Sequence, residues 1–493
     1  MQRAGAATAS EIALRFPDKL RAGALIFAGP GNNGGDAWVV ARALAASGVH
    51  VRVYEPIAPN TDDARAERVL AIPFVELGKA DDSALTSGDT YHGEGIVVDG
   101  LLGTGTTGAP RGSIAAAVAG LRAMRDRGAG PTIVALDVPT GVDATTGETH
   151  RPAPAAITFT YGTLKRGQLV ARAACGRIVV LDIGLGGQAA LEDGAPQAVS
   201  GRWVAEKLPN FPADAHKGTR KKLAIVGGGA GMSGAAILSA RAAWRSGIGM
   251  VKLVVAQETL ADIREAEPQS LTAPWPETDV DVERDIARWA DVVAIGPGLG
   301  AGSARQLVER VLRSFKGPVV LDADALNAFS SDSDALAALL YERPTVLTPH
   351  PVEFARLTGI AVDDVLKRRF DVAVPLARHT GAVVLLKGQP TIVTARDGTR
   401  LVSASGTPLL AAAGSGDLLT GMVATLLGQI GDPLNAAACA AWVHGRAASL
   451  VQHGQKSARG FSLDDVLAEL PRAWSIKSGP TRYPVLLELP AIV

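Results

Sequence analysis

Short apolar runs that alternate with alanine-rich helical stretches constrain the fold of this chain more than any other feature. Between residues 24 and 183 the runs are ALIFA, VRVYE, GIVVDG, TIVALDV, AITFT and RIVVLDI. Alternation of this kind is typical of a mainly parallel β-sheet with helices packed on both faces. The first part of the chain is therefore predicted to form an α/β domain.

A second series of the same kind begins after residue 201. Its apolar runs are LAIVGGG, MVKLVVA, DVVAIGPG, PVVLDAD, PTVLTPH, AVVLLKG and TIVTA, and a long helical region over 417–450 follows them. Residues 184–201, between the two series, are rich in glycine, alanine and polar residues, which is typical of a linker. Because 493 residues exceed one ordinary core, we expect two α/β domains, over residues 1–190 and 201–475.

The charge balance argues against several classes of partner. The chain has 49 acidic and 49 basic residues, and so no net field that would attract nucleic acid or an acidic membrane surface. Cys175 and Cys439 are far apart and surrounded by alanines, which indicates buried thiols in a reducing compartment. The N-terminus lacks the apolar core of a signal peptide, and no apolar stretch is long enough to span a bilayer. We expect a cytoplasmic protein without nucleic-acid or membrane partners.

The glycine pattern G-x-G-x-x-G of dinucleotide-binding turns occurs three times, beginning at Gly29, Gly103 and Gly229. With 56 glycines in the chain such matches arise easily, and three cofactor sites are implausible. The pattern is informative only where a strand, a helix and a downstream acidic residue frame it. The first match has a strand before it, a helix after it and Glu55 at the end of the next strand, which is partial support.

Polar motifs follow three strands of the first series. They are NNGGD at residues 32–36, DGLLGTG at 99–105 and DVPTG at 137–141. Since ligands collect at the carboxyl ends of parallel strands, these oxygen donors suit a monovalent or hard cation beside a proton-transferring carboxylate. Without histidine or cysteine, zinc is improbable. Each motif also has a structural explanation, as a helix cap or an ordinary turn.

Taken together, GPGNNGGD, VDGLLGTG and ALDVPTGVDATTG resemble the NAD(P)H-hydrate epimerase domain, a Rossmann-like three-layer αβα module, over about residues 1–190. The resemblance implies that Asn33, Asp99 and Thr140 bind potassium and that Asp137 contacts the substrate as acid or base. The glycine turn would then face a damaged dinucleotide substrate and not a hydride-carrying cofactor. The further substrate-binding residues that it implies are Asn32, Asn33, Gly34, Gly35, Asp36, Gly103, Thr104 and Gly105.

One departure from that family lies at the N-terminus. Its members usually carry a further helix before the residues that here read MQRAG, so that epimerase activity and dimerisation follow less directly from the motifs. A first half that serves only as a binding or scaffold module is the rival interpretation. The presence of Asn33, Asp99 and Asp137 argues against it.

The strongest local signal of the second half is AGSGD at residues 413–417, followed at once by an apolar helix. A glycine-rich turn at a helix N-terminus presents free N–H groups and the positive end of the helix dipole, which favours a phosphate. Asp417 would stand beside the transferred phosphoryl group, where its carboxylate can take a proton from an attacking hydroxyl. The alternative is that Asp417 merely caps the helix.

Other strand ends of the second half agree with a nucleotide-driven reaction. KGQPT at residues 387–391 places a cation and a hydroxyl near phosphates, although a lone lysine there is more often a solvated charge. GPGLG at 296–300 allows close backbone approach to a ligand. Asp322 and Asp324 form a pair that could hold magnesium, or either residue is structural. His350, which precedes a proline, favours a ligand contact.

With HKGT at 216–219 and GMSGAA at 231–236, these motifs resemble NAD(P)H-hydrate dehydratase, of the ribokinase-like superfamily, over about residues 201–475. That family more often has GGTGD where this chain has AGSGD, and serine keeps the hydroxyl. The resemblance implies that ADP binds with magnesium. It assigns substrate contacts to Ala235, Gly298, His350 and Asp417, and nucleotide contacts to Lys387, Gly388, Gln389, Pro390, Thr391, Gly414, Ser415 and Gly416.

The resemblances together imply a bifunctional repair enzyme. The first domain would interconvert the R and S hydrates of NADH and NADPH, and the second would dehydrate the S form while ADP gives AMP and phosphate. The rival is a vitamin or sugar kinase of the ribokinase superfamily fused to a non-catalytic Rossmann-like binding module. By analogy with such modules we expect a homo-oligomer.

Overall fold

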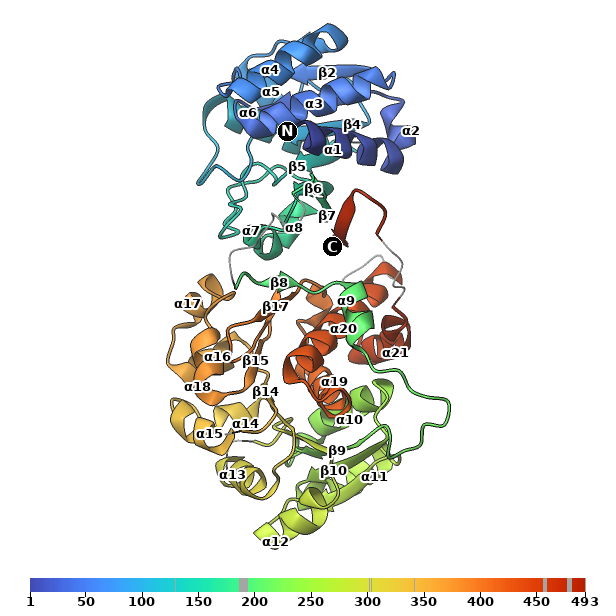
Figure 1. The fold of residues 1–493 in the computed structure, drawn as a ribbon, viewed down its shortest axis with the longest axis vertical. Helices are drawn as coiled ribbons and strands as arrows, with labels where there is room; N and C mark the ends of the chain where they lie inside the picture. The colour runs from blue at the N-terminus through green and yellow to red at the C-terminus, as the bar shows by residue number, and fades with distance from the viewer. Residues whose placement is uncertain are drawn as a thin grey trace. The chain divides into compact units, whose positions relative to one another are not determined.

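Two compact units make up the protein, whose structure is a computed structural model (Figure 1). Residues 1–190 and 480–493 form the first unit, and residues 191–479 form the second. The predicted linker at 184–201 lies partly outside the described residues. The structure describes residues 1–128, 130–185, 194–300, 302, 304–340, 342–454, 459–476 and 481–492.

The first unit is built on one sheet in the order β18-β7-β6-β5-β4-β1-β2-β3. All neighbours in it are parallel except β18, which pairs antiparallel with β7. The six strands predicted from the first series are all present. The strands are β1 (Ala24–Ala28), β2 (Val51–Tyr54), β3 (Glu76–Gly78), β4 (Ile96–Gly100), β5 (Thr132–Leu136), β6 (Ile157–Tyr161), β7 (Arg177–Leu181) and β18 (Val485–Leu489).

Strand β1 shows why helices cover both faces of this sheet. Its five residues are buried, and alternate side chains enter two different cores: Ile26 packs with Trp38, whereas Leu25 and Phe27 pack with Leu121. A strand that is apolar on both faces must be covered twice, which gives the predicted three-layer arrangement. The helices are α1 (Gln2–Arg15), α2 (Pro17–Leu20), α3 (Asn32–Ala46), α4 (Asp62–Ala71), α5 (Asp82–Ser87), α6 (Gly112–Arg125), α7 (Arg166–Val170) and α8 (Arg172–Cys175).

The last strand of the chain, β18, belongs to the first unit and was not expected there. Its Glu488 lies 2.8 Å from an Arg15 nitrogen and 2.6 Å from an Arg177 nitrogen, and Arg482 is bonded to the buried Glu11 of α1. The C-terminal segment therefore closes one edge of the first sheet (Figure 1).

The second unit contains a larger sheet in the order β11-β10-β9-β12-β13-β14-β15-β16-β17-β8. Strands from β11 to β15 are parallel, and β16 runs antiparallel to both of its neighbours. The strands are β8 (Gln197–Ala198), β9 (Lys222–Val226), β10 (Met250–Val255), β11 (Leu271–Pro274), β12 (Val292–Ile295), β13 (Val319–Leu321), β14 (Thr345–Leu347), β15 (Val383–Leu386), β16 (Thr391–Thr394) and β17 (Arg400–Ser403).

Helices again cover two faces of this sheet. In β9, Leu223 and Ile225 face the core that α10, α19 and α20 build, and Ala224 and Val226 face the core of α13, α15 and α18. The helices are α9 (Gly201–Lys207), α10 (Ser233–Arg245), α11 (Leu260–Ala266), α12 (Asp279–Val282), α13 (Ala304–Ser314), α14 (Asp324–Asn327), α15 (Ser333–Leu340), α16 (Pro351–Thr358), α17 (Val362–Lys367), α18 (Val374–Thr380), α19 (Ser415–Ile430), α20 (Pro433–Gly454) and α21 (Leu463–Trp474).

The α/β fold class predicted from the sequence is confirmed by these two parallel-dominated sheets. Cys175 and Cys439 are both buried and unpaired, as expected. Across the described residues, every helix is too short or too polar to cross a membrane.

The first glycine pattern is explained in part by backbone packing. A Cβ atom on Gly29 would lie 1.7 Å from the carbonyl oxygen of Leu101, and one on Gly34 would lie 1.8 Å from that of Gly29. A Cβ atom on Gly31 would meet nothing within 4 Å. Two of the three glycines therefore let α3 begin directly against β1 and the end of β4, while Gly31 borders open space.

This difference in packing predicts that two matched alanine variants differ in their free energy of unfolding. Gly34→Ala places a methyl group inside the van der Waals radius of a fixed carbonyl oxygen, and should destabilise the first unit by about 3 kcal/mol or more. Gly31→Ala, at an extended backbone position, should cost about 1 kcal/mol or less. Thermal unfolding of the two full-length variants compares them; equal melting temperatures would contradict the packing argument.

Candidate active sites

Three of the predicted site residues meet at the carboxyl edge of the first sheet. Asp99 is the last polar residue of β4, and its carboxylate accepts hydrogen bonds from the Thr140 backbone N–H at 2.8 Å and the Thr140 hydroxyl at 2.7 Å. The Thr140 hydroxyl also accepts the N–H of Leu102 at 3.1 Å, and the carbonyl of Leu102 accepts the amide of Asn33 at 3.0 Å. Asn33, Asp99 and Thr140 thus form one connected network.

Two features of this network suit a cation. Asp99 is fully buried, and burial raises the pKa of its carboxyl to about 6 although hydrogen bonds from Thr140 and Leu101 oppose the shift. The Oδ1 atom of Asn33 is buried and has no hydrogen-bond partner among the described residues. A buried carboxylate beside an unpartnered amide oxygen offers the hard oxygen ligands that a potassium ion requires.

Asp137 lies next to this network, just after β5. Its carboxylate is 2.7 Å from the ammonium of Lys165 and 3.3 Å from the N–H of Thr104, and its φ of 61° is unusual for a residue other than glycine. The Lys165 ammonium also donates to the hydroxyl of Thr160 at 2.7 Å. Strained backbone of this kind is frequent where a side chain has a functional orientation.

A second carboxyl group faces Asp137 from α3. Burial and the negative charge of Asp137 raise the pKa of Asp36 to about 7, while the terminal ammonium of Met1, 3.9 Å away, lowers it. Burial and the same two carboxylates also raise the pKa of the Tyr161 phenol, which is bonded to the Thr8 hydroxyl at 3.2 Å. Two carboxyl groups with different environments can hold and release a proton at one place.

The loop after β4 completes this edge. Thr104 and Gly105 are exposed, and a Cβ atom on Gly103 would lie 3.2 Å from the Asn33 side chain and 3.4 Å from the Asp137 carboxylate. Asn32 is exposed at the start of α3. Of the predicted substrate residues, Gly103 and Thr104 therefore lie against Asp137, whereas Gly34 and Gly35 are buried in α3.

Sequence reasoning missed Lys165 and Thr160. Both belong to the motif TYGTLKRG, which begins within β6 and continues past its end, so the rule that identified the other three motifs also applied here. The ion pair with Asp137 was hidden because the two residues are 28 positions apart in the chain.

In the second unit, Asp417 lies in the first turn of α19, after Gly414 with a φ of 92°. Burial and the negative charge of Asp322 raise the pKa of Asp417 to about 7, and the ammonium of Lys387 lowers it. Asp322 itself is almost fully buried at the end of β13. Asp417 is therefore a carboxyl group that can exchange a proton near neutral pH.

Lys387 balances the charge of this site. Its ammonium donates to Asp322 at 2.8 Å and lies 3.6 Å from Glu353, and its side chain is only 19% exposed. Burial lowers the pKa of Lys387, but the carboxylates of Asp322, Glu353 and Asp417 more than offset this effect and keep its pKa above the usual value. The solvated lysine that the sequence also allowed is excluded by these contacts.

Asp322 is engaged by the protein itself. Besides Lys387, the hydroxyls of Thr348 and Thr420 donate to it at 2.8 and 2.7 Å. Asp324 accepts the N–H of Gly300 at 2.8 Å. These contacts give both residues a structural role, and the magnesium interpretation of the pair stays a prediction. Within the described ranges, no group of three or more His, Cys, Asp and Glu residues is arranged to hold a metal.

His350 caps helix α16 and faces the same charges. Its Nδ1 accepts the N–H of Val352 at 3.1 Å, and its Nε2 lies 3.4 Å from Glu353. Burial lowers the pKa of His350, and the nearby Lys387 ammonium lowers it further although Glu353 raises it. The imidazole is therefore neutral near pH 7 and about half exposed toward the site.

A cavity of about 270 Å³ is lined by Lys387 and by Ser415 and Gly416, the two residues that precede Asp417. A Cβ atom on Gly416 would lie 3.4 Å from the Lys387 ammonium, so the glycine turn and the lysine face each other. His444 of α20, whose Nε2 is buried without a partner in the described structure, also lines the cavity and was missed from the sequence. Of the predicted nucleotide residues, the lining includes Lys387, Gly388, Gln389, Thr391, Ser415 and Gly416, but not Pro390 or Gly414.

Ala235 and Gly298 are the remaining predicted substrate residues, and they lie together. They follow β9 and β12, whereas Lys387 follows β15, on the other side of Asp322 in the strand order. A Cβ atom on Gly298, which has a φ of 61°, would lie 3.1 Å from that of Ala235. Helix α10, which carries Ala235, packs on α19, where the Ser239 hydroxyl donates to the carbonyl of Asp417 at 2.9 Å. These contacts place both residues beside the start of α19.

Comparison with known proteins gives matches along nearly the whole chain. Residues 223–472 match the family model described as NAD(P)H-hydrate dehydratase, and residues 1–167 match that of the YjeF-related protein N-terminus. The bifunctional NAD(P)H-hydrate repair enzyme Nnr of Moorella thermoacetica is 36% identical over 91% of this chain and 86% of its own length.

Solved structures resemble the second unit. The ADP/ATP-dependent NAD(P)H-hydrate dehydratase of Bacillus subtilis, co-crystallised with ATP and Mg²⁺, is 32% identical over 58% of this chain and 99% of its own, with a TM-score of 0.51. A ribokinase-like superfamily protein of Enterococcus faecalis, 22% identical over 57% of this chain and 97% of its own, gives a TM-score of 0.51 and supports the fold alone.

The buried charge balance around Lys387 predicts a non-additive pair of variants. Lys387→Met leaves Asp322 and Glu353 without their cation and should destabilise the second unit by about 3–5 kcal/mol. The double variant Lys387→Met/Asp322→Asn should lose less than the sum of the single losses, because it removes both charges. Urea unfolding followed by tryptophan fluorescence measures this, since six of the 7 tryptophans lie in the second unit and only Trp38 in the first. Strict additivity would contradict it.

Proposed function

The chain belongs to the family of bifunctional NAD(P)H-hydrate repair enzymes, and from this premise we propose that its two units carry two successive repair steps. The first, assigned to residues 1–190, interconverts the R and S hydrates of NADH and NADPH. The second, assigned to residues 201–475, dehydrates the S hydrate with ADP as phosphoryl donor. The observation that carries the proposal is Asp417, a buried carboxyl group with a pKa of about 7 that directly follows Gly416, which lines a cavity opposite Lys387.

The dehydration follows from the chemistry of the site. A hydroxyl on a reduced nicotinamide ring is a poor leaving group, and phosphorylation makes it a good one. Asp417 takes the hydroxyl proton, the oxygen attacks the β-phosphorus of ADP, and AMP leaves. The phosphate then departs with the electron pair of its C–O bond while the adjacent ring carbon loses a proton, which restores the double bond.

The protein supplies the donors for the transferred phosphoryl group. The N–H groups of Gly414 and Gly416 stand at the positive end of α19, while that of Ser415 donates to the Ala412 carbonyl, and the Lys387 ammonium faces Gly416. Magnesium bound with the nucleotide would neutralise its phosphates, in agreement with the Mg²⁺ and ATP of the Bacillus subtilis structure. Because Asp322 already accepts three hydrogen bonds, we propose that the nucleotide itself provides most of the ligands of this ion.

The epimerisation opens and recloses the ring with two proton transfers. In the hydrate the hydroxyl carbon is bonded to the ring nitrogen. As the hydroxyl loses its proton and becomes an aldehyde, the C–N bond breaks, its electron pair stays on the nitrogen and the nitrogen takes up a proton. Closure on the other face of the aldehyde reverses both transfers and inverts the carbon. We assign the proton transfer to Asp137, which Lys165 and Thr104 hold in place. Asp36, whose pKa lies at about 7 through burial and the charge of Asp137, is placed to exchange the same proton with water.

We further propose that Asn33, Asp99 and Thr140 hold a potassium ion. The support is the unpartnered Oδ1 of Asn33 and the buried carboxylate of Asp99, which together lack a positive charge. A cation there would fix the loop after β4, whose Thr104 N–H donates to Asp137. The ion would thus act on substrate position and not on the proton transfer itself.

The acid limb of the dehydratase tests the role of Asp417. The base is active when ionised, and its pKa is about 7, so kcat/KM for the S hydrate should fall about tenfold per pH unit below pH 7. Asp417→Asn should lose at least about 1,000-fold in kcat and should leave epimerisation intact. A variant that keeps its turnover, or a profile that stays flat down to pH 5, would remove Asp417 from proton transfer.

The whole proposal is tested with an epimer mixture of NADH hydrate, magnesium, potassium and either ADP or ATP. Recovery of dihydronicotinamide absorbance from the entire pool establishes both steps and identifies the donor. Asp137→Asn should recover only the S fraction at an unchanged rate, while the exposed control Glu148→Gln should recover everything. A stable phosphorylated product would instead favour the kinase interpretation.

A further inference from the structure

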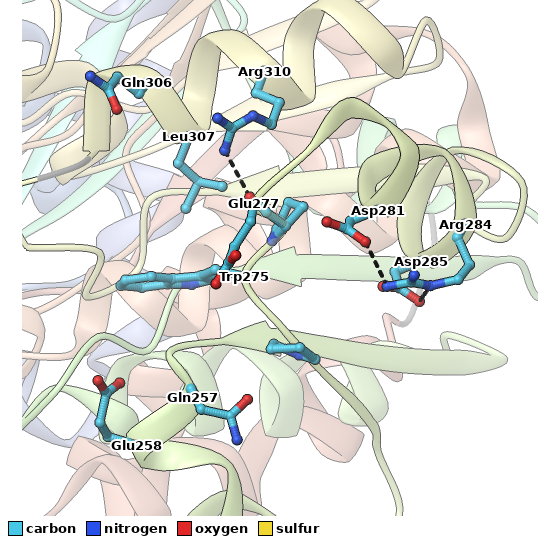
Figure 2. A pocket seen from close by; sticks show the side chains of 12 residues that line it. Gln257, Glu258, Trp275, Glu277, Asp281, Arg284, Asp285, Gln306, Leu307 and Arg310 are labelled. Atoms are coloured by element: carbon cyan, nitrogen blue, oxygen red, sulfur yellow. Dashed lines mark hydrogen bonds and ion pairs between the residues drawn. The ribbon is translucent and has the colours of Figure 1, made fainter.

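A cavity of about 560 Å³ in the second unit lies outside the sites described so far (Figure 2). It opens where β10 and β11 end, and Glu258, Trp275 and Glu277 follow these strands directly. In Figure 2 the indole of Trp275 separates Glu258 on one side from Leu307 and Arg310 of α13 on the other. The cavity therefore has a large aromatic surface with carboxylates close to it.

This cavity is continuous with the loop assigned to the substrate. The indole N–H of Trp275 donates to the carbonyl of Gly227 at 2.9 Å, and a Cβ atom on Gly229 would lie 3.3 Å from the indole ring. The N–H of Gly229 in turn donates to the carbonyl of Gly298 at 2.6 Å. Trp275 is thus separated from Gly298 by one glycine of the preceding loop.

The strand order places this cavity and the nucleotide cavity on opposite sides of Asp417. Asp322, beside Asp417, ends β13, whereas Lys387 and Thr391 lie at β15 and β16, and Trp275 follows β11. Strands lie about 4.8 Å apart, so β11 is roughly 19 Å from β13, and the Trp275 indole, bonded to Gly227 after β9, points back toward β13. A dinucleotide with its reacting ring at Asp417 and its pyrophosphate over Gly298 would reach Trp275 with its second base.

We propose that this cavity binds the purine nucleoside half of the hydrated dinucleotide, an assignment that rests on the proposed function. The purine stacks on Trp275, and the carboxylates of Glu258 and Glu277 accept hydrogen bonds from the ribose hydroxyls. A carboxylate that contacts the ribose 2′-hydroxyl is the usual means by which proteins recognise NAD.

The charges of the cavity make it selective between the two hydrates. Arg284 is 3.0 Å from Asp281 and 2.6 Å from Asp285, and Arg310 donates to the carbonyl of Pro276 at 2.8 Å and lies 3.9 Å from Asp279. Over the part of the chain that the structure describes, no ion pair engages Glu258 or Glu277. The 2′-phosphate of an NADPH hydrate would meet these carboxylates, while Arg284 is paired with two aspartates and Arg310 is turned to Pro276 and Asp279, so NADH hydrate is the preferred substrate.

Steady-state kinetics with the S hydrates of NADH and NADPH test this inference. Trp275→Ala should raise KM for both hydrates about tenfold or more, with kcat and KM for ADP nearly unchanged, and Trp275→Phe should keep most of the affinity. Glu258→Gln and Glu277→Gln should each increase kcat/KM for NADPH hydrate relative to NADH hydrate about fivefold. Glu283→Gln, an exposed change outside the cavity, is the matched control and should alter neither value.

Calorimetry separates failure of this inference from failure of the proposed function. NADH is titrated into the wild type and into Trp275→Ala, both saturated with ADP. The variant should lack one class of NADH-binding site that the wild type has, whether or not either protein repairs hydrates. Unchanged KM values and unchanged NADH binding would overturn the inference while the dehydratase assignment stands. A rise in KM for ADP instead would show that the cavity holds the nucleotide, which overturns it as well.

Discussion

Strands that are apolar on both faces determine where polar chemistry can gather in this protein. In β1 and β9 alternate side chains enter two separate cores, so that neither face can carry a functional group. In these two strands polar residues are therefore confined to the ends, and parallel pairing brings the carboxyl ends to one edge. Asn33, Asp99 and Asp137 meet in this way, and so do Asp322, Lys387 and Asp417 in the second unit.

The negative charge of carboxylates that are gathered at the strand ends must be compensated, and the two units do this differently. In the second unit, one ammonium, that of Lys387, lies among Asp322, Glu353 and Asp417, and its position leaves Asp417 with a pKa of about 7. In the first unit Lys165 pairs with Asp137, while Asp99 accepts hydrogen bonds and has no ion pair among the residues that the structure describes. The same edge geometry thus gives a carboxyl group near an ammonium in one case and a buried carboxylate held by hydrogen bonds in the other.

The sequence allowed the fold class and the placement of the motifs to be predicted, because β-branched runs and glycine turns are local signals. It did not allow β18 to be assigned, because its partner β7 is about three hundred residues earlier. Lys165 and Trp275 were missed for the same reason, since their roles depend on contacts made across the sheet edge. Lys387 was predicted from the sequence, which also allowed a solvated lysine. Only its burial and its carboxylate neighbours in the structure exclude that alternative.

The return of the chain to its first unit has a consequence for biosynthesis. Until β18 emerges from the ribosome, β7 presents an unpaired strand edge, and the buried Glu11 lacks its contact with Arg482. The first half of the gene, expressed alone, would therefore produce a sheet with an open edge and a tendency to associate. If the gene were split in two, the first half would need either its own copy of the codons for β18 or a new segment that covers β7. The first unit therefore depends for its structure on residues that follow the second unit.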